Sequence, residues 1–168
     1  MLAENILRKL EEFRIARFEF ILASEEHIEL PEYKGSALRG GFGTALRKVL
    51  CDEKKNNCDD CSRKKDCLFL YLFNTRLPEG SEVLKNTKNI PAPFVIEPPL
   101  ENKRIFAEGE EIIFNLVLIG KARNYLPHFI FAFEEFGRAG LGKGGGRFLL
   151  KSVSRTDKDG ITKTVFKS

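Results

Sequence analysis

The sequence predicts one α+β domain in which two helices cover one face of an antiparallel sheet. Three observations predict this fold class. The length of 168 residues suits one domain, and a balance of 42% hydrophobic to 31% charged residues is that of a folded chain. Apolar residues alternate in some segments and repeat every three or four residues in others. These segments follow one another as strand, helix, strand, strand, helix, strand.

In the first part of the chain, residues 3–12 read as a short amphipathic helix. Residues 14–23 predict a half-buried strand, because Phe18, Phe20 and Leu22 fall on one face and Arg17 and Glu19 on the other. A turn at 31–35 leads into a helix that runs to the first cysteine, with Ser36 as a plausible N-cap. Further along, the expected elements are a polar cysteine-bearing insertion (51–67), an irregular connection (74–93), a strand (94–97), a strand buried on both faces (112–119), a helix (122–136), a glycine-rich loop (137–146), a strand (147–155) and a last strand (161–166) after an Asp159–Gly160 turn.

This order is the ferredoxin-like βαββαβ plan. RNA-recognition motifs share it and present their open sheet face to RNA. We therefore expect a ferredoxin-like, RRM-like fold with a four-cysteine insertion after the first helix.

Net charge and the composition of individual segments limit which partners and which cellular location we expect. The net charge of +4 is too small to indicate a nucleic-acid partner by itself. The first residues do not form a secretory signal, and no apolar run approaches the ~20 residues that span a bilayer. We expect a cytoplasmic protein without a membrane partner, in which cysteines stay reduced and bind metal in preference to forming disulfides.

The four cysteines follow the spacing C-x6-C-x2-C-x5-C, at Cys51, Cys58, Cys61 and Cys67. Four thiolates at such spacing are typical of a closed structural zinc site that leaves no position for substrate. An iron–sulfur cluster and a loop of reduced cysteines are the alternatives. The cysteines predict metal binding and do not indicate catalysis.

The glycine-rich loop superficially resembles a phosphate-binding P-loop, since residues 137–144 read GRAGLGKG. Gly144 stands where a magnesium-binding Ser or Thr is required, and the loop follows a helix and precedes a strand, the reverse of a P-loop. Nucleotide hydrolysis is therefore not expected.

A run of basic residues without any acidic one accompanies this loop and the strand after it. A basic strand beside a glycine backbone suits contact with phosphates, although a solvated strand face is the alternative. With a spacing of four along a strand, the last three should share one face. The residues are Arg138, Lys143, Arg147, Lys151 and Arg155.

Three groups of motifs, in this order, resemble the CRISPR-associated RAMP-superfamily endoribonucleases that process precursor CRISPR RNA (the Cas-six type). The resemblance extends from about Phe18 to Val153. The motifs are Gly35–Gly43 leading into the cysteines; Phe94–Pro99 with Gly109–Glu110 and Phe114–Leu116; and Leu118–Ala122 with Tyr125–Pro127 and Gly140–Lys143.

The resemblance implies a single ferredoxin-like RAMP domain over residues 1–168 that binds CRISPR repeat RNA, in antiviral defence alongside other CRISPR-associated proteins. It also implies metal-independent cleavage, in which a 2′-hydroxyl attacks the adjacent phosphate and leaves a 2′,3′-cyclic phosphate. Zinc at residues 51–67 would then be structural. Family members usually carry a second such domain, so we expect an N-terminal half, a fragment or a short member.

The family's acid–base residue is commonly a histidine near the first helix, and the predicted first helix has none. His27, just before that helix, is the candidate, with Tyr33 to orient or donate and Lys34 to offset phosphorane charge. A polar loop histidine among glutamates is the alternative. His128 is expected at the surface.

Arg39 and Arg47 lie two turns apart on one side of the first predicted helix and could bind phosphate or form salt bridges. A non-catalytic RNA-binding subunit, and a zinc-ordered module that docks protein, are the competing functions.

Overall fold

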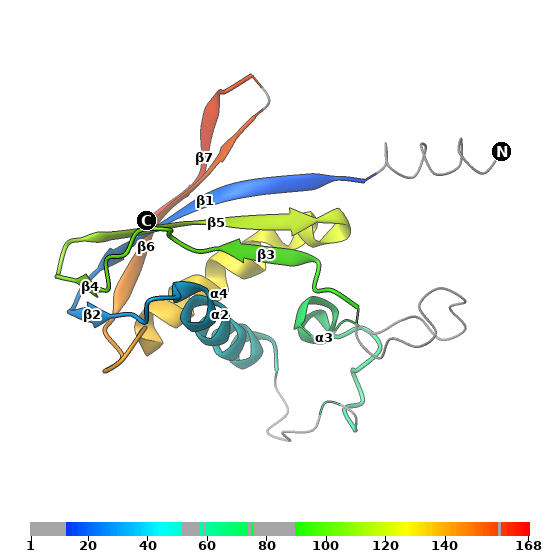
Figure 1. Cartoon of the computed structure of the whole chain (residues 1–168). Helices are drawn as coiled ribbons and strands as arrows, with labels where there is room; N and C mark the ends of the chain where they lie inside the picture. Colours follow the sequence, from blue (N-terminus) through cyan, green and yellow to red (C-terminus); the bar gives the residue numbers. More distant parts are fainter. Residues whose placement is uncertain (1–12, 52–57, 59, 74, 76–89, 158) are drawn as a thin grey trace.

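A five-stranded antiparallel sheet forms the centre of the protein (Figure 1). The structure is a computed structural model that describes residues 13–51, 58, 60–73, 75, 90–157 and 159–168. The strand order β3-β5-β1-β6 is that of the ferredoxin-like plan, and β7 extends the sheet at one edge. The strands are β1 (Ile15–Ser24), β3 (Phe94–Glu97), β5 (Glu111–Ile119), β6 (Phe148–Thr156) and β7 (Thr162–Lys167).

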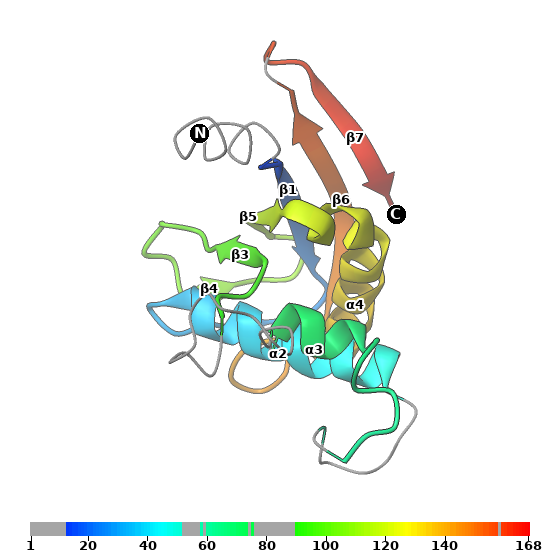
Figure 2. The same cartoon turned by 90° about the vertical axis from the view of Figure 1, so that its right-hand side faces the viewer.

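Two helices cover one face of the sheet, as Figures 1 and 2 show from two sides. They are α2 (Lys34–Leu50) and α4 (Leu126–Ala139), the latter preceded by a 3-10 turn, η1 (Gly120–Tyr125). The predicted α+β ferredoxin-like fold is thus confirmed, with the cysteine segment directly after the first covering helix. The sequence did not indicate α3 (Leu68–Phe73) or a two-stranded sheet of β2 (Ile28–Glu29) and β4 (Ile105–Phe106).

Phenylalanine side chains join the sheet to both helices. Phe133 of α4 packs against Phe20 of β1 and Phe114 of β5, with ring centroids 5.2 Å apart in each pair. It also stacks on Phe42 of α2 at 4.9 Å, and Phe42 stacks on Phe129 at 5.0 Å. Such ring contacts add to the free energy already gained from burying the apolar area.

The structure corrects two local predictions. The strand predicted to be buried on both faces, β5, alternates buried and more accessible positions, so only its helix-facing side is covered. Ser36 is not the N-cap of α2; the cap position is Tyr33, and the Ser36 hydroxyl donates to the Tyr33 carbonyl oxygen. The predicted helix at 3–12, and most of the predicted connection at 74–93, lie outside the described residues.

In the described part of the chain, no helix is both long enough and apolar enough to cross a membrane.

Replacing two helical glycines by alanine should have opposite effects on the free energy of unfolding. A Cβ on Gly137 would lie 2.1 Å from the carbonyl oxygen of Phe148, whereas a Cβ on exposed Gly40 meets nothing within 4 Å. Gly137→Ala should lower the free energy of unfolding by about 1–3 kcal/mol, because backbone must move to accommodate the methyl group. Gly40→Ala should raise it by about 0.5–1 kcal/mol, the helix propensity gain.

Urea denaturation of both variants checks this pair of predictions, and equal midpoints for the two would contradict it.

Candidate nucleic-acid interface

The glycine-rich loop between α4 and β6 packs directly on the segment that begins β2. The Lys143 amide donates to the Glu29 carbonyl oxygen at 2.9 Å. A Cβ on Gly142 would lie 2.3 Å from that same oxygen, and one on Gly146 would lie 2.3 Å from the His27 carbonyl oxygen. Gly142 also has a positive φ of 77°. These two glycines are therefore required by close backbone packing, whether or not the loop binds phosphate.

This packing brings together residues that are far apart in sequence. His27 lies exposed between β1 and β2, and Lys143 lies exposed in the loop packed on β2. The Arg147 carbonyl oxygen accepts hydrogen bonds from the amides of Glu25 and Glu26. The predicted catalytic histidine and two of the predicted phosphate contacts thus belong to the same end of the molecule, which we call the loop end (His27, Lys143 and Arg147).

An ion pair between Glu26 and Arg147 ties the loop end together. The Glu26 carboxylate accepts from the Arg147 Nε at 2.8 Å and backbone amide at 3.0 Å, and it lies 2.7 Å from the second guanidinium nitrogen. The hydrogen bond from Arg147 lowers the pKa of Glu26, and the same contact raises the pKa of Arg147. Because the folded-state pKa of the carboxyl group is lowered, this pairing is complete at neutral pH and is lost as the pH falls through that lowered pKa.

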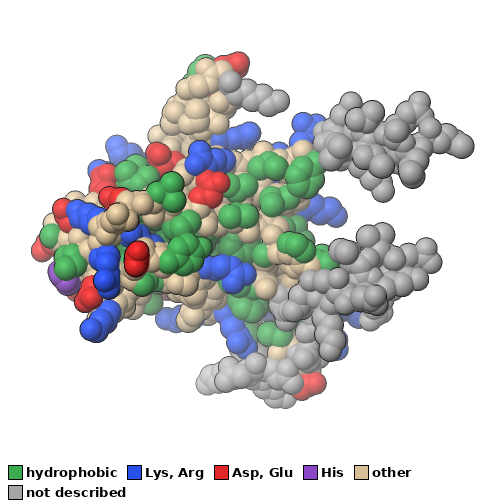
Figure 3. Space-filling model, viewed as in Figure 1, with side chains coloured by type: hydrophobic (Ala, Val, Ile, Leu, Met, Phe, Trp, Pro, Cys, Tyr) green, Lys and Arg blue, Asp and Glu red, His purple; other side chains and the backbone are tan. Residues whose placement is uncertain are grey.

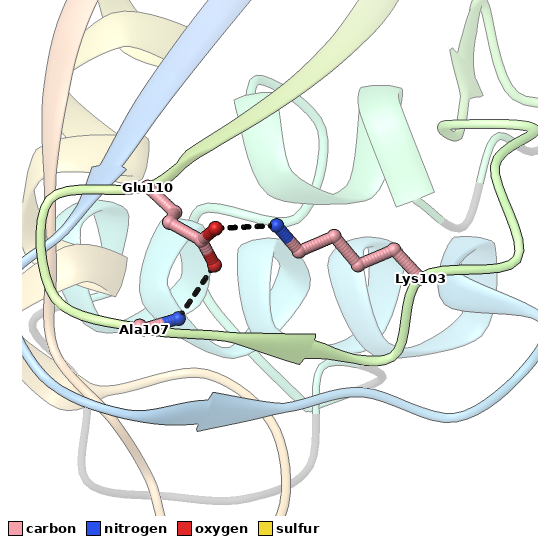
Figure 4. A network of polar contacts seen from close by, with 3 residues as sticks. All are labelled: Lys103, Ala107 and Glu110. Atoms are coloured by element: carbon pink, nitrogen blue, oxygen red, sulfur yellow. Dashed lines mark hydrogen bonds and ion pairs between the residues drawn. The ribbon is translucent and has the colours of Figure 1, made fainter.

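A hairpin turn supports the strand next to the loop end (Figure 4). Glu110 accepts from the Lys103 ammonium at 2.7 Å and from the Ala107 amide at 2.8 Å. The hydrogen bond from Lys103 is the main cause of the lowered pKa of Glu110. This network fixes the connection between β5 and β4, and β4 is the strand on which β2 pairs.

Of the two other predicted catalytic residues, only one is exposed. Tyr33 is 67% exposed, with its ring over Gly35. Lys34 is 1% exposed, and its ammonium group donates to the Glu101 carbonyl oxygen at 2.6 Å. This contact gives Lys34 a structural partner, whereas Tyr33 remains open to solvent.

The predicted RNA-binding arginines of α2 lie against aromatic rings. The Arg39 guanidinium lies 5.0 Å from the ring centre of Phe73, and that of Arg47 lies 5.8 Å from the ring centre of Phe69. Both rings belong to α3, so these cations pack along the α2–α3 contact and not beside the loop end.

The basic strand does not present its cations on one face. Ile21 pairs with Ser152 but Leu22 pairs with Leu150, so Lys151 is an extra residue in a β-bulge. Beyond the bulge the alternation changes, which places Arg155 on the helix side with buried Val153. The expectation that Arg147, Lys151 and Arg155 share one face is therefore wrong for Arg155.

Two more predicted contacts have acidic partners. Lys151 pairs with Glu111 at 2.6 Å across the open face of the sheet, and Arg138 pairs with Glu135 within α4. Figure 3 accordingly shows blue and red side chains interspersed, with no patch of one sign on the visible face. Within the described part of the chain, Lys143 and Arg155 have no side-chain partner.

The open sheet face does not provide stacking rings. Its central positions on β1 and β5 are polar or aliphatic, as at Glu19, Ile21, Ile113 and Asn115. An ion pair of 2.7 Å between Arg17 and Glu97 crosses the face. RNA-recognition motifs stack bases on sheet aromatics, so the sheet's described residues do not support that mode of binding.

The four cysteines lie between α2 and α3, none of them in a disulfide bond. Cys51, Cys61 and Cys67 line a pocket that His128 also lines. Among the described residues, no three Cys, His, Asp or Glu side chains lie close enough together to hold one ion. His128 is half-buried here and not at the open surface. Sequence reasoning missed its place beside the cysteines, because no linear spacing connects it to them.

Comparison with known proteins gives a family and a fold. A family described as "AF_1859_N: N-terminal domain" matches residues 13–168. An uncharacterized protein of Archaeoglobus fulgidus is 33% identical over 113 residues, which make up 67% of this chain and 37% of that relative. The match therefore spans well under half of the relative's length.

A chain of the Csm3-Csm4 subcomplex, from the type III-A CRISPR-Cas interference complex, has a similar structure. The TM-score is 0.52 at 15% identity, over 92% of this chain and 89% of that one. At this identity the likeness concerns the fold alone, and it agrees with the ferredoxin-like fold expected from the sequence. The narrower Cas-six resemblance stays a prediction. Because the family match extends over residues 13–168, the chain belongs to the AF_1859_N N-terminal domain family.

Proposed function

We propose that this chain binds RNA as a RAMP-like component of CRISPR-associated machinery, with other CRISPR-associated proteins as partners. One observation carries the proposal: the glycine-rich loop packs on the backbone of 27–29 and so gathers His27, Lys143 and Arg147 at the loop end. The fold shared with a chain of a CRISPR-Cas complex supports the same assignment.

Phosphate contact at the loop end depends mainly on Lys143. Its side chain is exposed and has no partner among the described residues, so its full charge is available to a phosphate. Arg147 is exposed as well, but Glu26 already neutralises it. RNA could compete for this guanidinium, because a phosphate is, like a carboxylate, an anionic acceptor for its N–H groups. We therefore place RNA at the loop end and not on the open sheet face.

We further propose that the chain cleaves the RNA that it binds at the loop end. His27 is exposed, and its backbone runs so close to Gly146 that a Cβ there would lie 2.3 Å from the His27 carbonyl oxygen. A neutral imidazole there would take the proton of a 2′-hydroxyl as that oxygen attacks the adjacent phosphorus. Lys143 would stabilise the added negative charge on the phosphorane. The bond to the 5′-oxygen then breaks and leaves a 2′,3′-cyclic phosphate. The 5′-oxygen takes a proton from water, and the imidazolium returns its proton to water. No metal takes part in these steps.

Lys143→Ala should weaken binding of a CRISPR-type repeat RNA several-fold and reduce the slope of log affinity against log salt by about 1. Lys121→Ala is the matched control, since Lys121 is an exposed lysine beyond the opposite end of β5. Electrophoretic mobility shifts at several salt concentrations measure both. Equal losses for the two variants would mean that only overall charge matters.

Glu26→Gln should strengthen RNA binding, by about tenfold or less, because it leaves the Arg147 charge free of its carboxylate. The Gln amide can still accept from the Arg147 backbone, so the loop should keep its conformation. Fluorescence anisotropy with labelled repeat RNA measures the change. Affinity that is unchanged at low salt would remove Arg147 from the RNA surface.

His27→Ala should abolish cleavage of end-labelled repeat RNA in the presence of chelator, and leave RNA affinity within about twofold, since general base catalysis contributes ~10²–10⁴-fold. The wild-type product should end in a cyclic phosphate. If wild-type protein binds the RNA without cutting it, the cleavage form of the proposal fails and the binding form stands.

A further inference from the structure

A pocket of about 590 Å³ lies where the end of α2, the cysteine segment and the start of α4 meet. Cys51 directly follows α2, and Cys67 directly precedes α3. Cys61 lies between them, and His128 enters from the first turn of α4. Cys58, which the structure also describes, is not among the residues that line the pocket. Three of the four cysteines therefore line the pocket, and Cys58 does not.

One nitrogen of the His128 ring lacks a hydrogen-bond partner in the described part of the chain. Its Nδ1 is buried and has no hydrogen-bond partner among the described residues. Such a nitrogen is costly to leave unpaired, because folding removes the water to which it would bond. Tyr125 packs edge-on against the ring at 5.7 Å, and Tyr71 packs against Tyr125.

We propose that Cys51, Cys61, Cys67 and His128 bind one zinc ion, and that Cys58 is not a ligand. Three thiolates and one imidazole are a standard tetrahedral zinc set. Their site would carry one net negative charge, which the nearby Arg63 and Lys65 on the pocket lining complement. A histidine ligand also distinguishes zinc from an iron–sulfur cluster, which ordinarily takes four thiolates.

Binding requires the ligands to converge, since no three of them now lie within reach of one ion among the described residues. Two ligands are fixed by their helices: the Cys51 amide donates to the Arg47 carbonyl oxygen at 2.9 Å, and His128 is part of α4. Cys61 lies in a turn, where its carbonyl oxygen accepts from the Lys64 amide at 3.2 Å. Zinc would therefore draw the turn around Cys61 toward α4 and attach the insertion to the domain core.

The test measures zinc per chain by mass spectrometry after the full chain is loaded with zinc and desalted. Wild-type protein should hold about one ion. His128→Asn and Cys61→Ser should fall below about half an ion, because each removes a ligand. Cys58→Ser should keep the ion, and so should His27→Asn, the matched control for loss of a histidine.

Retention by His128→Asn, or loss by Cys58→Ser, overturns the proposal in favour of another ligand set, and a metal-free wild type overturns it outright. Zinc X-ray absorption on the wild-type protein gives an answer even if a variant does not fold. Three sulfur neighbours at about 2.3 Å and one nitrogen at about 2.0 Å are expected. Four sulfur neighbours contradict the assignment. None of these readouts depends on RNA.

Discussion

The phenylalanine cluster between the sheet and the two covering helices holds the other parts of the structure in place. Phe133 contacts rings on β1, β5 and α2 at once, so these elements cannot shift separately without losing ring contacts. Strand β1 pairs with β5 on one side and β6 on the other, at the centre of the sheet. The position of β6 in turn fixes where the glycine-rich loop ends, and hence where it meets β2. The loop end is thus a consequence of core packing.

The sequence predicted the parts of the fold that depend on local periodicity. The alternation at Phe18, Phe20 and Leu22 describes β1 correctly, because one of its faces is covered and the other is open. The apolar run of β5 led to the wrong prediction that both its faces are buried. Its open face also carries aliphatic residues such as Ile113, and no local pattern distinguishes an exposed aliphatic residue from a buried one. The β2–β4 sheet was not predictable, because it consists of only two residue pairs between segments that are far apart in the sequence.

The candidate site shows the same division. Residue types at His27 and Lys143 indicated phosphate chemistry, but their proximity depends on backbone contacts between segments far apart in the chain. Lys34 was a catalytic candidate, but its side chain is buried and its ammonium group donates to the Glu101 carbonyl oxygen. Neighbouring residues in the sequence did not indicate this burial. Arg39 and Arg47 were expected either to bind phosphate or to form salt bridges. Their contacts with rings of α3 were not anticipated, because that helix is too short for periodicity to reveal.

The bulge at Lys151 has a consequence for how β6 can change in length. Before the bulge, even-numbered residues such as Leu150 face the helices, and after it odd-numbered ones such as Val153 do. Removing one residue at 151–152 would give a regular strand with the same buried side chains on both halves. Removing Leu149 instead, with the bulge kept, would shift the first half by one position and turn Phe148 out of the core. Variation in length should therefore be tolerated at the bulge and disfavoured next to it.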